Sequence, residues 1–177
     1  MTSAQPGILA PVPRAARYLT FRLREGAHPE AALRRLAARS HPGESLVVGL
    51  GHATVARLGR AVPSLRELPP LAGPGASVPS TPAALWIWLR GDDPGELLHL
   101  GRQLAQLLDD AFVVDSTIDA FRYAGGRDLT GYEDGTENPK DDAAEVAAIL
   151  AGAGAGLDGS SFVAVQRWRH TLARFEA

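Results

Sequence analysis

The 177-residue chain contains no cysteine. This absence excludes disulfide frameworks, thiolate zinc sites, iron–sulfur clusters and cysteine nucleophiles. Lysine is almost absent as well, since Lys140 is the single example, and the formal net charge is only −2. Because phosphate binding needs a concentrated positive surface, this charge balance argues against nucleic acid as a partner.

Long hydrophobic runs are also missing, so the sequence predicts no membrane span. The N-terminal stretch 1–13 lacks a basic cluster followed by an apolar run, which argues against a secretory signal and favours a cytoplasmic protein. With 45% hydrophobic residues the chain can bury a core without disulfides or a structural metal. Its length corresponds to roughly one domain with a remainder.

The spacing of apolar residues predicts a repeated β-α-β order. Four strands are expected, at 17–23, 44–51, 84–90 and 112–123. Two main helices are expected, at 29–40 and from Asp93 to about 109, with a short helix at 53–58. This order is typical of an α+β, ferredoxin-like split βαβ sandwich, in which two helices cover one face of a four-stranded antiparallel sheet.

The segments between and after these elements suggest how the chain is organised into domains. A proline-rich arm is expected at 5–13 and a long loop at 61–82, and together with the sandwich they make a first domain over 1–123. A polar loop at 124–139, a short helix at 140–150 begun by Asn138-Pro139, and a glycine-rich linker at 151–160 follow. A strand-like run at 161–168 and a helix start complete 161–177, which is interpreted as the start of an incomplete second ferredoxin-like domain.

The third expected strand carries two tryptophans on its second face. Leu85, Ile87 and Leu89 alternate with Trp86 and Trp88, so the tryptophans must project away from the helices. Tyr18 is expected on the same face of the first strand. Such aromatic residues are either ordinary half-exposed side chains or a surface that a partner domain or subunit covers.

The polar loop 124–139 is the segment most suggestive of chemistry. Asp134-Gly135 is typical of a turn and Asn138-Pro139 of a helix start, which explains the glycines and the proline structurally. Loops of this composition also position a carboxylate over a ligand, with glycines that permit close backbone approach. Composition alone leaves both interpretations open.

The stretch Gly131-Tyr-Glu-Asp-Gly135 matches the GxxDG signature of dye-decolourising (DyP-type) haem peroxidases, and its extension Thr136-Glu-Asn-Pro139 is similar to the bacterial cytosolic, type B-like members. Further segments resemble the same family and extend the resemblance along the whole chain. They are Gln5-Pro-Gly-Ile8, Trp86 to Asp93, Phe121-Arg-Tyr123 and Val165 to His170. The chain is thereby identified as resembling the N-terminal half of such a peroxidase.

The resemblance implies a pair of ferredoxin-like domains with haem b held in the second, and hydrogen peroxide and a small organic electron donor or dye as substrates. It implies that Asp134 is the distal acid/base, which accepts a proton from peroxide and delivers it to the departing oxygen. It also implies that the residues around Asp134 contact the cofactor. These are Gly131, Glu133, Gly135 and Thr136.

The family's axial histidine and distal arginine lie beyond the equivalent of Ala177, so the resemblance supplies no iron ligand in this sequence. His170 lies in a segment that matches the family, but its position is not that of the iron ligand. The chain is therefore a fragment of a peroxidase, half of a split enzyme, or a free-standing module. The alternative to a peroxidase is a catalytically silent, haem-free module that forms a homo-oligomer, or pairs with a second chain, through the Tyr18/Trp86/Trp88 face.

Overall fold

The computed structural model of the protein describes residues 4–39, 43–167 and 170–176. Its elements in chain order are η1 (Pro6–Ile8), β1 (Ala15–Leu23), α1 (Glu30–Ala38), η2 (Gly43–Ser45), β2 (Leu46–Leu50), α2 (His52–Arg57), β3 (Leu71–Gly73), β4 (Ala76–Val78), β5 (Leu85–Gly91), α3 (Pro94–Leu107), β6 (Phe112–Phe121), α4 (Asp142–Ala148) and α5 (Leu172–Phe175). Among the described residues, no helix is both long and apolar enough to cross a membrane.

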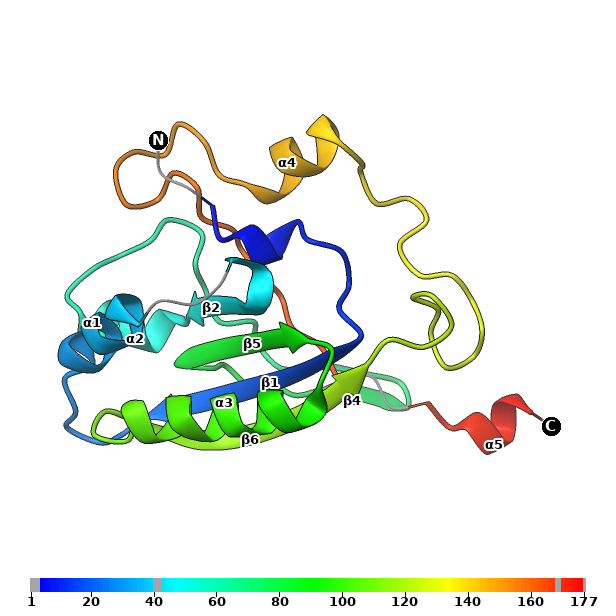
Figure 1. Cartoon of the computed structure of the whole chain (residues 1–177), viewed down its shortest axis with the longest axis horizontal. Coiled ribbons are helices and arrows are strands. Elements are labelled where there is room, and N and C mark those ends of the chain that lie inside the picture. The colour runs from blue at the N-terminus through cyan, green and yellow to red at the C-terminus, as the bar shows by residue number, and fades with distance from the viewer. Residues whose placement is uncertain (1–3, 40–42, 168–169, 177) are drawn as a thin grey trace.

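The main sheet has the strand order β2-β5-β1-β6, and every neighbouring pair is antiparallel. With the two main helices following β1 and β5, this is the split βαβ arrangement that the sequence predicts. The helix α3 lies across one face of the sheet in Figure 1, where it contacts β1, β5 and β6 as well as α1. The predicted ferredoxin-like α+β fold is confirmed.

The core lies between the sheet and the helices. Leu85, Ile87 and Leu89 of β5 are fully buried, and the register pairs Leu89 with Leu46 of β2 and Ile87 with Leu19 of β1. Because alternate residues of a strand share a face, these pairs form a continuous apolar layer under the helices. The helices add Leu36 from α1 and Leu97, Leu104 and Leu108 from α3 and its C-terminal end.

The helix α3 begins at the cap that the sequence predicts. The carboxylate of Asp93 accepts hydrogen bonds from the backbone N–H groups of Gly95 at 2.7 Å and Glu96 at 3.0 Å. Pro94 occupies the first helical position, where its missing N–H costs nothing. The local sequence therefore determines where this helix starts.

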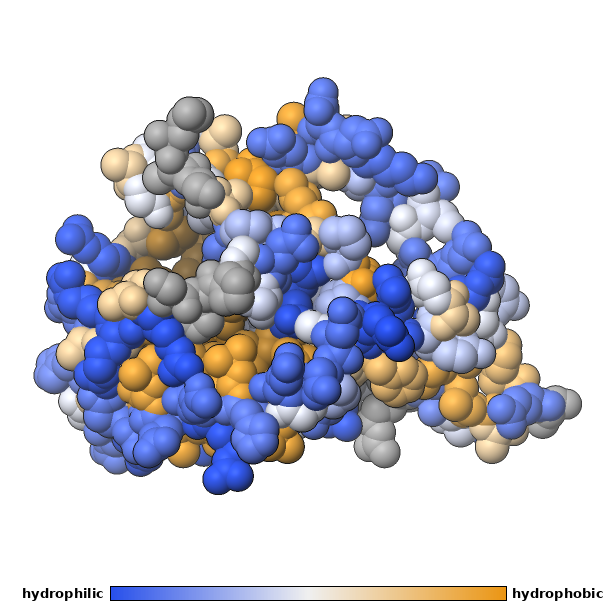
Figure 2. Space-filling view, viewed as in Figure 1, coloured by the Kyte–Doolittle hydropathy of each residue, from blue (hydrophilic) through white to orange (hydrophobic). Residues whose placement is uncertain are grey.

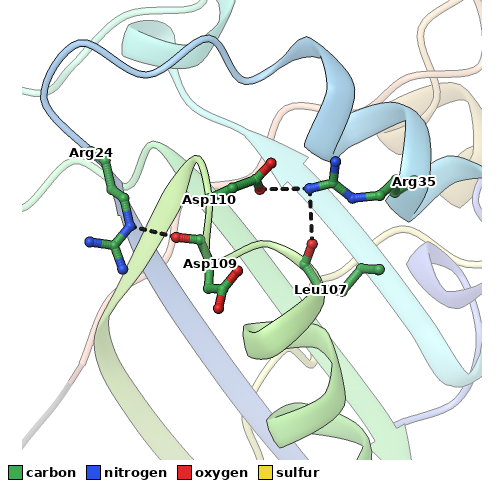
Figure 3. Close-up of polar contacts among 5 residues, drawn as sticks. All are labelled: Arg24, Arg35, Leu107, Asp109 and Asp110. Carbon is green, nitrogen blue, oxygen red and sulfur yellow. Dashed lines mark hydrogen bonds and ion pairs between the residues drawn. The ribbon is translucent and has the colours of Figure 1, made fainter.

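Two arginines fix the other end of α3, as Figure 3 shows. Arg24 donates from Nε to the carbonyl of Asp109 at 2.5 Å. Arg35 of α1 donates to the carbonyl of Leu107 at 3.2 Å and to the Asp110 carboxylate at 2.6 Å, and this hydrogen bond lowers the pKa of Asp110 below its ordinary value. Since the last carbonyls of a helix lack intrahelical partners, these contacts join α3 to β1 and α1.

The N-terminal arm is held against the second face of the sheet by Arg90. This residue of β5 is only 5% exposed, and its guanidinium donates to the carbonyls of Glu44 at 3.0 Å, Ala10 at 3.1 Å and Pro11 at 2.5 Å. A side chain at Gly7 would lie 2.6 Å from Val47 of β2, so only glycine allows the arm to approach this closely. Burial lowers the pKa of Arg90.

Three sequence predictions differ from the structure. The expected loop 61–82 contains the short antiparallel hairpin β3–β4, although every residue of both strands is exposed. The helix expected at 140–150 is shorter, and its N-cap is Asp141 rather than Asn138-Pro139. The described part of the strand-like run, 161–167, forms no strand, and Trp168 lies outside the described residues.

We predict that Arg90→Met lowers the free energy of unfolding by about 2 kcal/mol, because three carbonyls of the arm and of η2 lose their donor together. Urea denaturation measures this change. The matched control is Arg22→Met, which removes an exposed ion pair to Asp115 and should change stability by no more than about 0.5 kcal/mol. Equal stability of the two variants would contradict the anchoring role of Arg90.

Candidate functional site

The GxxDG segment lies on a small folded-back structure that follows β6. Isolated antiparallel bridges connect Tyr123 with Arg127 and Arg127 with Glu133. The turn between them is closed by backbone hydrogen bonds from Asp128 to the carbonyl of Tyr132, 3.1 Å, and from Gly131 to the carbonyl of Asp128, 3.0 Å. The loop is therefore ordered by its own backbone, although most of its side chains are exposed.

Asp128 stabilises the inside of this turn. One of its carboxylate oxygens accepts from the Thr130 hydroxyl at 2.5 Å, the Thr130 N–H at 2.8 Å and the Tyr132 N–H at 3.3 Å. The hydrogen bond from the Thr130 hydroxyl is the largest cause that lowers the pKa of Asp128 below its ordinary value. An electrostatic interaction with His170 acts on the pKa of Asp128 in the same direction as a smaller cause.

Arg127 pairs with the carboxylate of Glu133 but not with that of the adjacent Asp134. Its guanidinium donates to the carbonyl of Gly131 at 2.8 Å and to the carboxylate of Glu133 at 2.7 Å. Among the residues that the structure describes, no hydrogen bond or ion pair engages the carboxylate of Asp134, which is exposed. The loop thus neutralises Glu133 and leaves Asp134 available to an external proton or ligand.

The two glycines of the motif are required by backbone conformation. Gly131 has φ +91° and Gly135 has φ +73°, both in the left-handed region that side chains disfavour. A Cβ at Gly135 would also collide with the side-chain amide of Asn138. The glycines therefore allow the chain to turn sharply on either side of Asp134.

The structure brings the predicted site residues together on one exposed turn. Gly131, Glu133, Asp134, Gly135 and Thr136 are continuous in sequence apart from Tyr132, and all but Gly135 are exposed. Sequence reasoning did not single out Arg127 and Asp128, whose contacts hold the turn. The Asp-x-Thr spacing at 128–130 is a signal that could have indicated Asp128, because such side chains bond their own backbone two residues on.

The C-terminal segment lies against this turn. The rings of Tyr132 and Phe175 meet edge-to-face, with centroids 6.4 Å apart. Tyr132 is 67% exposed and Phe175 is 54% exposed, so the contact covers neither ring. Figure 2 shows hydrophobic residues on the surface beside the C-terminal end of the chain.

Two open surface hollows lie away from the loop. One lies along α3 beside His99 and Arg102, and the other lies between α1 and the β2–α2 region beside Leu33 and Leu50. Neither is lined by a residue of 124–139. Within the described ranges, no group of three or more His, Cys, Asp or Glu side chains could hold a metal ion. Asp134 and Glu137 are thus exposed carboxylates of the described loop that no hydrogen bond or ion pair engages.

The fold and the loop together define a ferredoxin-like α+β protein with a carboxylate presented on a glycine turn. The model of the C-terminal part of the Dyp-type peroxidases matches residues 125–177, which include this turn. A dye-decolorizing peroxidase of Brevibacterium linens is 32% identical over 196 aligned positions, which cover 100% of this chain and 53% of the relative. The chain belongs to the DyP-type peroxidase family.

Solved structures agree with this assignment. A heme complex of a DypB variant from Rhodococcus jostii RHA1 matches with a TM-score of 0.72 and 32% identity, covering 86% of this chain and 54% of that one. A Dyp-type protein from Shewanella oneidensis shares the fold, with a TM-score of 0.75 at 22% identity over 90% of this chain and 56% of its own. The chain spans about half the length of the curated relative and of both structures.

We predict that acid disorders the turn through Asp128. Its folded-state pKa is lowered, so the carboxylate stabilises the turn fully above the unfolded pKa of about 4, and this contribution is lost as pH falls through the folded pKa. NMR titration of the Thr130 and Tyr132 amide signals measures the change.

Asp128→Asn should remove this titration, because the amide carries no charge. Asp158→Asn is the matched control, since Asp158 holds a separate turn by accepting from Ala153 and Gly154. Amide signals that titrate identically in wild type and Asp128→Asn would rule out Asp128 as the titrating group.

Proposed function

We propose that this chain carries the proton-transfer side of a haem-dependent DyP-type peroxidase, with hydrogen peroxide and a small organic electron donor as substrates. Asp134 is the proposed acid/base. The observation that carries this proposal is the division between the neighbouring carboxylates, in which Glu133 is paired with Arg127 while Asp134 is free and exposed. A general base must be free to approach the proton that it accepts, and of the two carboxylates only Asp134 is not engaged by another side chain.

The residues around Asp134 suit the distal side of such a cofactor. Gly131 and Gly135 present backbone without side chains, and Thr136 adds an exposed hydroxyl next to them. On the iron side the resemblance supplies no ligand, and His170, which is exposed, does not match the family's ligand position. We therefore assign no iron ligand to the described residues.

Haem b, when bound, supplies the iron that holds peroxide and the one-electron chemistry that follows. The part assigned to this chain is a proton movement. The Asp134 carboxylate accepts a proton from one peroxide oxygen and returns it to the other oxygen, which leaves as water. Its exposure allows an unhindered approach, and its lack of a fixed partner allows it to change protonation without breaking an ion pair.

A silent module that oligomerises through the Tyr18/Trp86/Trp88 face is the weaker alternative. Two copies joined by a twofold axis would place the same surface on both sides of the interface. Part of that face is already covered within the chain, since Arg90 is buried and donates to the carbonyls of Ala10 and Pro11 of the N-terminal arm. The relatives named above are peroxidases, which favours the enzymatic proposal.

The decisive measurement is the Soret absorption of the purified chain incubated with haemin, followed by peroxide-dependent oxidation of a dye. We expect a shifted band and turnover when imidazole is added as the iron ligand, because no described residue is assigned to that position. Asp134→Asn should slow turnover by about 100-fold without abolishing the shifted band, because the amide cannot accept the proton. Glu137→Gln, an exposed carboxylate three residues along, is the control and should leave turnover unchanged.

Absence of both a shifted band and turnover would contradict peroxidase function for this chain. Turnover that is equal in wild type and Asp134→Asn would remove Asp134 from the mechanism and leave the family assignment intact.

A further inference from the structure

An aspartate is followed directly by a glycine at two places in the sequence, Asp134-Gly135 and Asp158-Gly159. The side-chain carboxyl group of such an aspartate is open to attack by the backbone nitrogen of the next residue, because glycine has no side chain that hinders the approach. The attack closes a five-membered imide. Since the two pairs have the same local chemistry, their structural surroundings decide how readily each one reacts.

In the pair Asp158-Gly159, hydrogen bonds hold both reacting groups. The Asp158 carboxylate accepts from the backbone N–H groups of Ala153 at 2.7 Å and Gly154 at 3.3 Å. The N–H of Gly159 donates to the carbonyl of Leu150 at 2.9 Å. Both residues of the pair are also partly buried. Closing the imide ring here requires these contacts to break first.

In the pair Asp134-Gly135, neither reacting group is held. Among the described residues, no hydrogen bond or ion pair engages the Asp134 carboxylate, and the N–H of Gly135 donates to no backbone carbonyl. The carbonyl of Gly135 accepts from the N–H of Asn138 at 3.0 Å, a contact that does not involve the attacking nitrogen. Asp134 is exposed, so water reaches the carboxyl group and any imide formed from it.

Two other side chains of the loop are unsuited to this reaction. Asn138 is the single asparagine of the chain, and Pro139, which follows it, has no N–H with which to attack. Asp128 is the other aspartate of the loop, and its carboxylate accepts hydrogen bonds from Thr130 and Tyr132. Asp134-Gly135 is therefore the reactive pair of this loop.

From this contrast we propose that Asp134-Gly135 is a site of spontaneous aspartyl isomerisation in the folded protein. The Gly135 nitrogen attacks the side-chain carboxyl carbon of Asp134 and a C–N bond forms, while the amide proton and the carboxyl hydroxyl leave as one water molecule. Water then cleaves the imide. Cleavage at the side-chain carbonyl carbon restores aspartate, and cleavage at the main-chain carbonyl carbon leaves an isoaspartyl linkage. The overall change is an isomerisation that consumes no oxidant or cofactor.

The isoaspartyl product carries its carboxylate at a different place. Its main chain runs through the former side chain and is longer by one methylene group, and the free carboxylate is attached directly to Cα. Gly131 and Gly135 hold the turn on either side of Asp134 at left-handed φ values, so this lengthening displaces the carboxylate from the position that the turn gives it. The product also presents the group on which isoaspartyl carboxyl methyltransferases act, so an enzyme of that class is the partner that fits the modified turn.

The test is peptide mapping of the whole chain after prolonged incubation, with electron-transfer fragmentation to distinguish aspartyl from isoaspartyl linkages. The matched control lies in the same molecule, since Asp158-Gly159 is the same dipeptide. We expect at least fivefold more isoaspartate at Asp134 than at Asp158 in the folded protein. In urea, where the fold no longer distinguishes the two pairs, the two yields should agree within twofold.

Equal yields at the two pairs of the folded protein, or a folded ratio no larger than the ratio in urea, would overturn the proposal. Asp134→Glu should abolish isomerisation at this position, because glutamate would have to close a six-membered imide. An isoaspartyl methyltransferase should incorporate at least fivefold fewer methyl groups into this variant than into the aged wild-type chain. Equal methylation of the two would likewise contradict Asp134-Gly135 as the site.

The effect on activity rests on the proposed function of Asp134, and it is measured separately. Peroxide-dependent dye oxidation with haemin and imidazole is followed in samples that contain increasing fractions of isoaspartate. We expect turnover to fall in proportion to the isomerised fraction. Constant turnover while isoaspartate accumulates would reject Asp134 as the acid/base and retain the modification site. Absence of isoaspartate, with turnover that depends on Asp134, would reject the modification site and retain the proposed function.

Discussion

Strand β5 lies between β2 and β1, and its residues divide between two faces with different chemistry. Leu85, Ile87 and Leu89 bury one face under the helices, while Trp86, Trp88 and Arg90 occupy the other. The apolar layer stabilises the sandwich through burial, which is the dominant favourable term in folding. On the second face, Tyr18 stacks on the two tryptophans, and Arg90 donates hydrogen bonds to carbonyls of the N-terminal arm and of η2. A one-residue slip of β5 would exchange the two faces, so register is fixed by both.

The elements predicted correctly are those whose signals are local. The alternation at 84–90 and the capping residues from Asp93 onward determine β5 and α3 without reference to the rest of the chain. The hairpin β3–β4 has no such signal, because exposed strands carry no alternation between buried and solvated residues. At 161–167 the opposite error occurs, since the sequence predicts a strand and the structure forms none. Apolar residues there resemble a strand, but pairing needs a neighbour, and none of the described strands pairs with it.

The motif names the residues of the candidate site but not the contacts that they make. It specifies Asp134 and its glycines and leaves Glu133 at a variable position, so it says nothing of what Glu133 contacts. The structure separates the two carboxylates because the chain folds back and brings Arg127 to Glu133. That contact joins residues six positions apart across a turn, and no residue pattern specifies which of two adjacent carboxylates the arginine takes. Asp128, which orders the turn, lies outside the GxxDG motif, although its Asp-x-Thr spacing to Thr130 is recognisable.

The proposed proton transfer depends on the sheet through β6. Asp134 lies on the loop that continues this strand, and β6 pairs with β1, where Tyr18 lies opposite Ile118 of β6 as well as Trp88 of β5. The sheet register therefore fixes the strand end from which the loop begins. Beyond that end, the bridges of Arg127 with Tyr123 and with Glu133 order the chain and bring the Arg127 guanidinium to the Glu133 carboxylate. The long-range pairing thus fixes where the loop starts, and the local fold-back determines that Glu133 and not Asp134 is paired.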